Sequence, residues 1–323
     1  MRAYQLTSLN QPPALQNIGE VSPKAKQVKL RIHACGLNFA DLLTVQGKYQ
    51  ERPPLPMTMG MEVAGTIVEV GSDVIDLQVG QRVAVYSGQD GLAEYGCFDA
   101  NRCLILPDSM PFTDAAAFQI AYGTSHLALA HRANLQPGER LVVTGAAGGV
   151  GLTAVEIGAQ LGAEVVAIAR GSDKLAIAQK MGAHHLIDAT APDIRDQIKA
   201  LGGANVVYET VGDPLFRDCF RAMNPLGRLL VIGFAGGTVP QIPANHLLVK
   251  NITLIGLYWG GYRSFAPDEL TGSLKTLLEW YEAGTLRPHV SHVLPLERVE
   301  DGLELLRSRQ ATGKVVVTPV PHS

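Results

Sequence analysis

A glycine-rich turn is the strongest chemical signal in the sequence. Residues 144–151 read TGAAGGVG and stand where the apolar run LVVTG must give way to a helix. Gly148 would let the backbone approach a pyrophosphate, and Gly151 would let the helix pack closely on the strand. The N-terminus of the helix would supply N–H donors and a partial positive charge. We therefore expect dinucleotide phosphates to contact Ala147, Gly148, Gly149, Val150 and Gly151.

This turn is an imperfect match to the dinucleotide-binding fingerprint. Ala146 stands at the first glycine position of G-x-G-x-x-G. An ordinary tight turn between a strand and a helix is the alternative interpretation. Strand, turn, helix and second strand all fall within the roughly 30 residues that the fingerprint requires, which favours a binding site.

The residues after the next apolar run, EVVAIA, discriminate between the two nicotinamide dinucleotides. NAD sites place an Asp or Glu about 20 residues beyond the glycine turn, where it binds the ribose 2′-OH. Here the run ends in Arg170, with Lys174 close behind. A guanidinium and an ammonium would pair with a 2′-phosphate, and each charge-assisted bond is worth about 1.5–3 kcal/mol. The sequence therefore predicts NADPH as the cofactor, with a solvated loop charge as the alternative for Arg170.

Strands and helices alternate around these residues, which indicates the scaffold that positions them. From Leu141 onward the runs RLVVTG, EVVAIAR, LIDA, NVVYET and RLLVIG alternate with helical segments, a pattern typical of a doubly wound parallel sheet. Before that, short β-type runs such as QVKLRIHAC and VAGTIVEVG are separated by Gly and Pro. After Leu257 come an amphipathic helix around 270–282, a helix around 298–309 and a strand at 314–318.

This order predicts an α/β protein with one domain inserted in another. We expect a β-rich domain in residues 1–120, a Rossmann dinucleotide-binding domain in 121–260, and a return of residues 261–323 to complete the first domain. The tail is too small to fold alone, which is why we assign it to the β-rich domain.

Composition excludes several classes of function. The 323 residues are 46% hydrophobic and 18% charged, with a formal net charge of -3, and no apolar run approaches the length of a membrane span. These values argue against disorder, a membrane protein and a dedicated nucleic-acid binder. The first residues, MRAYQLTSLNQPPAL, lack a signal or transit pattern, and the four cysteines form no CxxC pair, so we expect a cytoplasmic protein with free thiols.

Three motifs are informative: ACGLNFADLL at 34–43, followed by GKY, then GMEVAG at 60–65, and AAGGVG at 146–151. They resemble motifs of the medium-chain dehydrogenase/reductase superfamily, and in particular of its zinc-independent quinone oxidoreductase (zeta-crystallin-like) branch. The resemblance covers essentially the whole chain. It implies a Rossmann sheet inserted in a β-rich GroES-like catalytic domain.

The same stretches depart from the zinc alcohol dehydrogenases of that superfamily. Those enzymes carry G-H-E-x-x-G, whose His binds catalytic zinc, whereas this sequence has Met61 in front of Glu62. A thioether cannot replace an imidazole on zinc. Their first cysteine ligand aligns with Asn38, which leaves Cys35 as a small core residue. The resemblance thus implies no metal and a hydride passed from NADPH to a quinone or an α,β-unsaturated carbonyl.

The resemblance also implies roles for individual residues. Asn38 and Tyr49 would be catalytic, donating an amide and a phenol hydrogen to the reduced oxygen. The alternatives are a helix cap for Asn38 and a surface aromatic for Tyr49. Thr124 would lie beside the nicotinamide, and a hydroxyl bonded to its own helix is the alternative.

Further cofactor and substrate contacts follow from the same resemblance. Gly233 and Phe234, after the run RLLVIG, would pass the nicotinamide ribose, and Lys314 would lie near the cofactor unless it is a plain strand-start lysine. Three more residues either shape a flat substrate pocket or pack a domain junction, namely Tyr258, Trp259 and Arg263.

The predicted function is therefore NADPH-dependent quinone oxidoreduction. We expect a homodimer, as is common among similar proteins, that acts on a small molecule and binds neither nucleic acid nor membrane. An enoyl-thioester (enoyl-CoA) reductase is the alternative within enzymes. An NADPH-binding protein with little catalysis is the alternative outside them. A zinc alcohol dehydrogenase is disfavoured by Met61 and Asn38.

Overall fold

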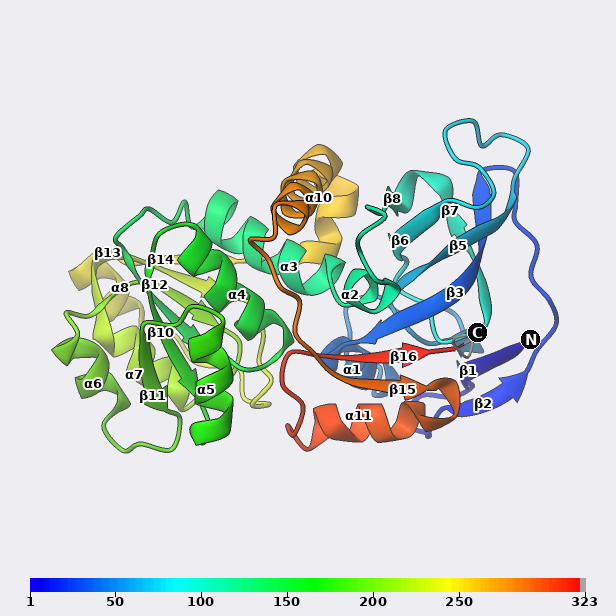
Figure 1. Cartoon of the computed structure of the whole chain (residues 1–323). Coiled ribbons are helices and arrows are strands. Elements are labelled where there is room, and N and C mark those ends of the chain that lie inside the picture. Colours follow the sequence, from blue (N-terminus) through cyan, green and yellow to red (C-terminus); the bar gives the residue numbers. More distant parts are fainter. Residues whose placement is uncertain (320–323) are drawn as a thin grey trace. The chain divides into compact units, whose positions relative to one another are not determined.

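The computed structural model describes residues 1–319, and contacts within it divide the chain into two compact units. Unit 1 comprises Met1–Ile120 and Pro288–Ser323, and unit 2 comprises Ala121–Arg287. The predicted fold class, a parallel α/β sheet inserted in a β-rich domain, is confirmed (Figure 1). Across residues 1–319, none of the helices combines the length and apolar character needed to cross a membrane.

Unit 1 is built on a sheet with strand order β15-β16-β3-β5-β6-β8, to which β7 adds by pairing with β3. A smaller sheet has the order β2-β1-β4. The elements before the insertion are β1 (Arg2–Leu6), β2 (Ala14–Asn17), β3 (Gln27–Leu37), α1 (Phe39–Val45), β4 (Met57–Thr58), β5 (Glu62–Val70), β6 (Arg82–Tyr86), β7 (Tyr95–Asp99), η1 (Ala100–Arg102), β8 (Cys103–Ile105) and α2 (Phe112–Ala116). The returning elements are β15 (Val290–Pro295), η4 (Leu296–Arg298), α11 (Val299–Arg307) and β16 (Lys314–Thr318).

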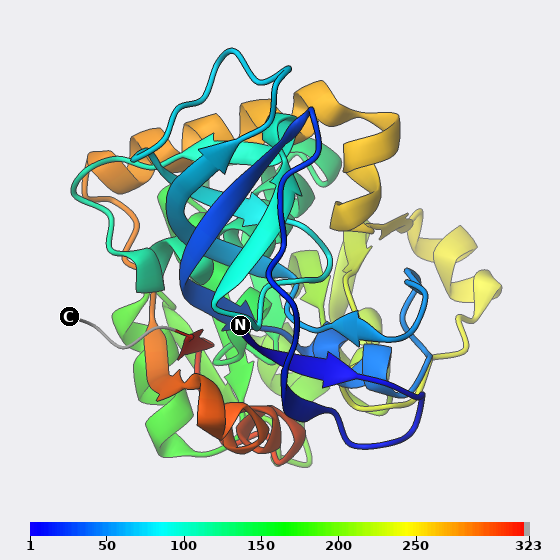
Figure 2. The ribbon, with the colours of Figure 1, turned by 90° about the vertical axis from the view of Figure 1, so that its right-hand side faces the viewer.

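Strand β3 organises this unit because it pairs antiparallel with β5, β7 and β16. Figure 2 shows β3 in blue beside the cyan strands. Its apolar residues enter one core: Val28, Leu30 and Ile32 are all fully buried, and side chains of β5, β16 and α11 join them. Cys35 belongs to the same core, as predicted. Strand β3 thus joins the segments before and after the insertion in one hydrophobic core.

Unit 2 carries a six-stranded parallel sheet with the order β11-β10-β9-β12-β13-β14. Its strands are β9 (Arg140–Thr144), β10 (Glu164–Ala169), β11 (His185–Asp188), β12 (Ala204–Glu209), β13 (Met223–Val231) and β14 (Thr253–Gly256). Its helices are α3 (Gln119–His126, which begins in unit 1), η2 (Leu127–Arg132), α4 (Gly149–Gln160), α5 (Ser172–Lys180), α6 (Ile194–Ala200), α7 (Leu215–Ala222), α8 (Ala244–Lys250), η3 (Trp259–Gly261), α9 (Tyr262–Phe265) and α10 (Pro267–Glu282). The central strands are continuous apolar runs because helices cover both faces of such a sheet.

The second domain boundary differs from the predicted one. Residues 261–287 belong to unit 2, so the return to unit 1 begins at Pro288 rather than at residue 261. Helix α10 is held there by a 2.8 Å hydrogen bond between Ser273 Oγ and His126 Nδ1, and Leu277 is fully buried. Beyond α10, the Arg287 N–H donates to Glu156 Oε1 at 2.7 Å. The amphipathic pattern showed that α10 has a buried face but not which unit covers it.

Candidate active site

The glycine-rich turn between β9 and α4 is shaped by two glycines that the fold itself requires. Gly145 has φ +60°, a left-handed conformation that suits glycine. A Cβ on Gly151 would lie 2.2 Å from the Gly145 carbonyl oxygen, so only glycine lets α4 pack this closely on the turn. Gly145 therefore makes the tight turn that the fingerprint assigns to its first glycine, and Ala146, fully buried, fills the core beneath it.

Gly148 stands apart, because no packing constraint explains it. A Cβ there would meet only the Gly145 carbonyl oxygen, at an ordinary 3.4 Å, and the residue is exposed. It is the N-cap of α4, whose first-turn N–H groups and dipole favour an anion. Ala147 is buried, while Gly149 and Val150 are partly exposed. The turn thus offers open backbone where the phosphates of a dinucleotide fit.

A buried carboxylate, Glu209 at the end of β12, ties this turn to the next loop. It accepts hydrogen bonds from the Thr144 hydroxyl at 2.9 Å, the Val211 N–H at 3.0 Å and the Gly212 N–H at 2.9 Å. Burial raises the pKa of Glu209. In turn, the Thr210 hydroxyl donates to the Thr144 carbonyl at 2.8 Å. Sequence reasoning missed Glu209, although an acid that ends the buried run NVVYE was a usable signal.

The loop after β13 lies against the loop after β12. The Gly233 N–H donates to the Glu209 carbonyl at 3.3 Å, and Ala235 donates to the Thr210 carbonyl at 3.0 Å. Gly233 and Phe234 are both partly exposed. Their position at the carboxyl ends of parallel strands is where ligands bind in doubly wound sheets.

The tip of β10 carries the predicted phosphate-binding cations. Arg170 is exposed directly after the strand, and Lys174 lies partly exposed in the first turn of α5. Gly171, with φ +84°, donates its N–H to Asp188 Oδ2 at 3.0 Å. The pKa of Asp188 is lowered by hydrogen bonds from Thr190 and from the Gly171 N–H. The positive charge of Arg170 lowers it further. This neighbouring acid from the tip of β11 was not predicted.

The other predicted contacts of unit 2 lie in α3 and in the segment that follows β14. Thr124 is buried, and the Trp259 ring packs on Gly123, where an added Cβ would lie 2.5 Å from its Nε1. This contact favours the packing interpretation for Trp259. Tyr258 and Arg263 are partly exposed.

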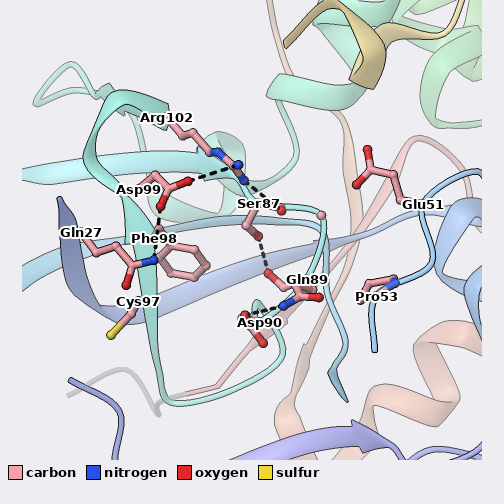
Figure 3. Close-up of a pocket in the computed structure, with 11 residues that line it drawn as sticks. Gln27, Glu51, Pro53, Ser87, Gln89, Asp90, Cys97, Phe98, Asp99 and Arg102 are labelled. Carbon is pink, nitrogen blue, oxygen red and sulfur yellow. Dashed lines mark hydrogen bonds and ion pairs between the residues drawn. The ribbon is translucent and has the colours of Figure 1, made fainter. Parts of the chain in front are cut away.

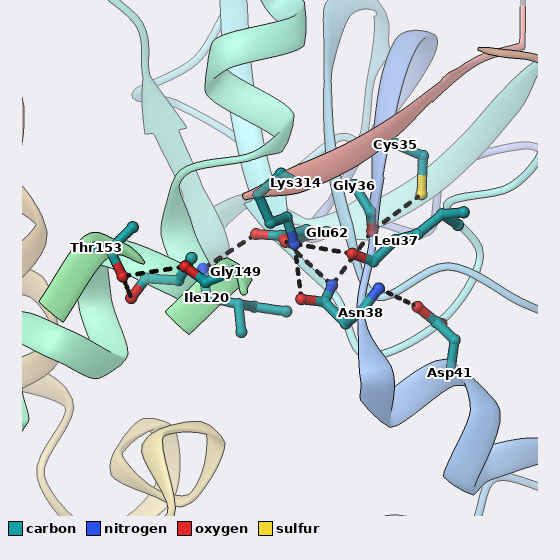
Figure 4. A network of polar contacts seen from close by, with 11 residues as sticks. Cys35, Gly36, Leu37, Asn38, Asp41, Glu62, Ile120, Gly149, Thr153 and Lys314 are labelled. Carbon is teal, nitrogen blue, oxygen red and sulfur yellow. Dashed lines mark hydrogen bonds and ion pairs between the residues drawn. The ribbon is translucent and has the colours of Figure 1, made fainter. Parts of the chain in front are cut away.

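In unit 1, Asn38 lies in a polar network that Figure 4 shows at close range. The Lys314 ammonium donates to Leu37 O at 3.0 Å, Asn38 Oδ1 at 2.7 Å and Glu62 Oε1 at 2.6 Å. The Asn38 amide donates to Glu62 Oε1 at 3.0 Å and Gly36 O at 3.2 Å. The other oxygen, Glu62 Oε2, accepts the Ile120 N–H at 3.0 Å. Both Lys314 and Glu62 are buried, and Asn38 is partly exposed.

This network revises two expectations. Asn38 is the N-cap of α1 in backbone terms, but its side chain turns to Glu62 and Lys314 instead, with both amide hydrogens already bonded. Donation to a substrate oxygen would therefore cost one of these bonds. Lys314 uses all three ammonium hydrogens internally, which disfavours a direct contact of its side chain with the cofactor.

Asp41 supports the same segment from α1. Its Oδ2 accepts the Asn38 backbone N–H at 2.8 Å, and burial raises its pKa to about 7. Tyr49 lies beyond α1, in the segment before β4, and is partly exposed. The structure thus gathers Asn38, Glu62 and Lys314 in one network and leaves Tyr49 in a separate segment.

The sequence predicts no metal site at positions 38 and 61, which lie in this region. Met61 is 2% exposed, and its neighbour Glu62 is already engaged by an ammonium. In the part of the chain from 1 to 319, no three or more His, Cys, Asp or Glu side chains are grouped so that they could hold a metal ion. Burial raises the pKa of the Cys35 thiol well above its ordinary value.

A pocket of about 230 Å³ in unit 1 contains none of the predicted site residues (Figure 3). Its polar groups pair mainly with one another: Asp99 accepts from Gln27 at 3.2 Å and forms an ion pair with Arg102 at 3.2 Å. Gln89 donates to Asp90 at 3.0 Å. The rest of the lining is Glu51, Pro53, Ser87, Gly88, Cys97 and Phe98.

Comparison with known proteins connects these features to one family. Residues 24–108 match the model of the alcohol dehydrogenase GroES-like domain, and residues 149–279 match that of the zinc-binding dehydrogenases. The quinone oxidoreductase-like protein 2 homolog of Nematostella vectensis is 41% identical over 98% of this chain and 88% of its own length.

Solved structures agree with this relationship. The quinone oxidoreductase of Thermus thermophilus, solved also in complex with NADPH, is 32% identical with a TM-score of 0.87 over 98% of this chain and 100% of its own. The quinone oxidoreductase of Escherichia coli, complexed with NADPH, is 25% identical with a TM-score of 0.89 over 98% and 99%. The chain therefore belongs to the quinone oxidoreductase-like group of the medium-chain dehydrogenase/reductase family of oxidoreductases.

Proposed function

We propose that the protein is an NADPH-dependent oxidoreductase that reduces a quinone or an α,β-unsaturated carbonyl compound without zinc. The observation that carries the proposal is the open turn at Gly148 beside the exposed Arg170 on the neighbouring strand tip. The relatives named as quinone oxidoreductases, two of them solved with NADPH, support the choice of cofactor and acceptor.

Different residues of the chain bind different parts of NADPH. Backbone N–H groups of Ala147 and residues 149–151 hold the pyrophosphate, while the Gly148 N–H is bonded to the Gly145 carbonyl at 2.9 Å. The Arg170 guanidinium and the Lys174 ammonium hold the 2′-phosphate. Gly233 and Phe234 flank the nicotinamide ribose, with Thr124 beside the ring. When bound, NADPH supplies a hydride to the acceptor.

Zinc independence is supported by the donors around Asn38. A metal that polarises an alcohol oxygen needs ligands such as imidazole or thiolate, and positions 38 and 61 carry an amide and a thioether instead. The Glu62 carboxylate is already neutralised by Lys314 at 2.6 Å, so a second cation beside it would be repelled. A conjugated acceptor is electrophilic without a metal and needs mainly orientation, exclusion of water and a hydrogen bond at its oxygen. We assign the last role to the Tyr49 hydroxyl. Both amide hydrogens of Asn38 are bonded to Gly36 O and Glu62 Oε1, so we assign Asn38 to orienting the bound molecule through its amide oxygen.

The test is NADPH consumption by chelator-treated protein of measured metal content. Ortho-quinones, simple enones and an enoyl-CoA serve as acceptors, and a primary alcohol with NADP tests the reverse chemistry. We expect quinone or enone reduction that survives chelation. Preference for enoyl-CoA would favour the thioester reductase, alcohol oxidation that needs zinc would refute the proposal, and bound NADPH without turnover would favour a binding protein.

Cofactor preference has its own prediction. Arg170→Ala should raise the Kd for NADPH by about 10-fold or more, since it removes a charge-assisted bond to the 2′-phosphate, and should leave the Kd for NADH nearly unchanged. Titration of NAD(P)H fluorescence measures both constants. Arg195→Ala is a control, because Arg195 is an exposed cation of the same unit paired with Asp196. Equal losses for both cofactors would remove Arg170 from the 2′-phosphate site.

The predicted cytoplasmic location and homodimer belong to this proposal as well. Cell fractionation and light scattering of the purified protein test them.

A further inference from the structure

We propose that Lys314 is a positioning residue that fixes the orientation of the Asn38 amide, and that it does not contact the cofactor through its side chain. This inference rests on the proposed function, in which Asn38 lies beside the reacting groups. It replaces the expectation that Lys314 is a cofactor-binding residue.

The ammonium has no hydrogen left for a ligand. Its three hydrogens are matched by Leu37 O at 3.0 Å, Asn38 Oδ1 at 2.7 Å and Glu62 Oε1 at 2.6 Å. The Lys314 side chain is 6% exposed and that of Glu62 is 1% exposed. A ligand would have to break a buried ion pair to reach this cation.

The neighbours allow the Asn38 amide only one orientation. An ammonium only donates and a carboxylate only accepts, so Oδ1 must face Lys314 and Nδ2 must face Glu62. A flipped amide would set Nδ2 against the ammonium and Oδ1 against the carboxylate. With both Nδ2 hydrogens bonded, what Asn38 offers outward is the second lone pair of Oδ1. Asn38 therefore accepts a hydrogen bond from a hydroxyl or amide N–H of a bound molecule, and it does not donate one.

Three strands build this arrangement through their registers. Val315 of β16 pairs with Leu37, which places Lys314 beside Asn38, and Glu62 of β5 pairs with Gly36. A Cβ on Gly36 would lie 2.0 Å from Ala116 O and 3.0 Å from Glu62 Oε1. Glycine at this position thus keeps the carboxylate in place, and the network is fixed by backbone rather than by flexible loops.

The test separates charge balance from amide orientation. Lys314→Met leaves the Glu62 carboxylate buried without its partner, so it should lower the Tm. The double variant Lys314→Met/Glu62→Gln removes both charges and should recover most of the Tm, but Gln can both donate and accept and no longer dictates the amide orientation. In this double variant we expect kcat with the best acceptor to fall by about 10- to 100-fold. The Kd for NADPH should stay within about threefold of the wild-type value.

The control and the coupling test use other residues of unit 1. Lys29→Met/Glu69→Gln removes a second lysine–glutamate pair, 2.7 Å apart between β3 and β5, and should change neither kcat nor Kd. In an Asn38→Ala background, Lys314→Met should lower kcat no further, because Lys314 acts through Asn38. Three results would each overturn the inference. They are a wild-type kcat in the Lys314→Met/Glu62→Gln variant, losses of kcat that add to that of Asn38→Ala, and a tenfold loss of NADPH affinity.

A readout without turnover keeps the inference separate from the proposed function. The side-chain ¹⁵N–H₂ resonances of Asn38 can be assigned by comparison with Asn38→Ala. In the wild-type protein we expect these hydrogens to exchange slowly with solvent. In the double variant we expect them to exchange as fast as those of solvent-exposed amides. If the wild-type protein reduces no acceptor, the proposed function fails while this spectrum still decides the orientation. An Asn38 amide that is unprotected in the wild type overturns the inference.

Discussion

Gly148→Ala should remove most NADPH affinity and leave the stability of the fold unchanged. The backbone at Gly148 has φ -81° and ψ 177°, which alanine adopts without strain. The added methyl would meet only the Gly145 carbonyl oxygen at 3.4 Å. We therefore expect the free energy of unfolding to change by no more than about 0.5 kcal/mol.

The loss of affinity follows from where the methyl group points. It would occupy the open face of the turn, so a pyrophosphate seated there must move out of reach of one or two N–H donors. Each hydrogen bond to a charged group is worth about 1.5–3 kcal/mol, so the loss of one raises the Kd by about 10- to 150-fold.

Gly151→Ala is the matched comparison. Its Cβ would lie 2.2 Å from the Gly145 carbonyl oxygen and 2.8 Å from the carbonyl carbon, both rigid backbone atoms. Helix α4 must shift to relieve this overlap, at a cost of about 1–3 kcal/mol in unfolding free energy. Calorimetry and NADPH fluorescence titration on both variants make the distinction. A Gly148→Ala protein with wild-type Kd, or one destabilised as much as Gly151→Ala, would refute the reasoning about the turn.

Two further predictions concern unit 2. Burial, together with the nearby His131, lowers the pKa of His126 to about 4, below its usual 6.5. The unfolded chain then binds a proton at a higher pH than the folded one, so unfolding free energy should fall from pH 6.5 to 4 by up to about 3 kcal/mol. Urea unfolding at several pH values measures this slope, and an unchanged slope in His126→Gln would contradict the assignment. Gly272→Ala in α10 meets no atom within 4 Å and should raise unfolding free energy by about 0.5–1 kcal/mol; a lower Tm would show that the site is not open.

Local patterns in the sequence predicted the elements of unit 2. Buried parallel strands read as continuous apolar runs, and each predicted run, from RLVVTG to RLLVIG, is a strand of the sheet. Helix α10 was placed in the wrong unit because periodicity reports a buried face without naming the surface that covers it.

Contacts between distant residues could not be predicted in the same way. The Lys314–Glu62 ion pair joins residues 252 positions apart, and neither residue's neighbours in the sequence announce it. Asn38 has the residue type and position of a helix cap, so only the fold shows its side chain turning to Lys314. Glu209 is a mixed case: its position at the end of a buried run was a usable signal, whereas its bond to Thr144, 65 residues away, could be seen only in the fold.

The pairing of β16 with β3 has a consequence for synthesis on the ribosome. Lys314 and Leu37, joined across these strands, are 277 residues apart, which translation at about 5–20 residues per second covers in about 14–55 s. Unit 2 is a continuous segment and can fold during that interval. Strand β7 can pair early with Gln27–Arg31 of β3, but the edge of β3 at Cys35–Leu37 stays open until β16 arrives. Such an edge is a template for pairing with other chains, and Glu62 has no cation beside it until β16 arrives. Chaperones therefore have the most to protect while the nascent chain contains β3 but not yet β16.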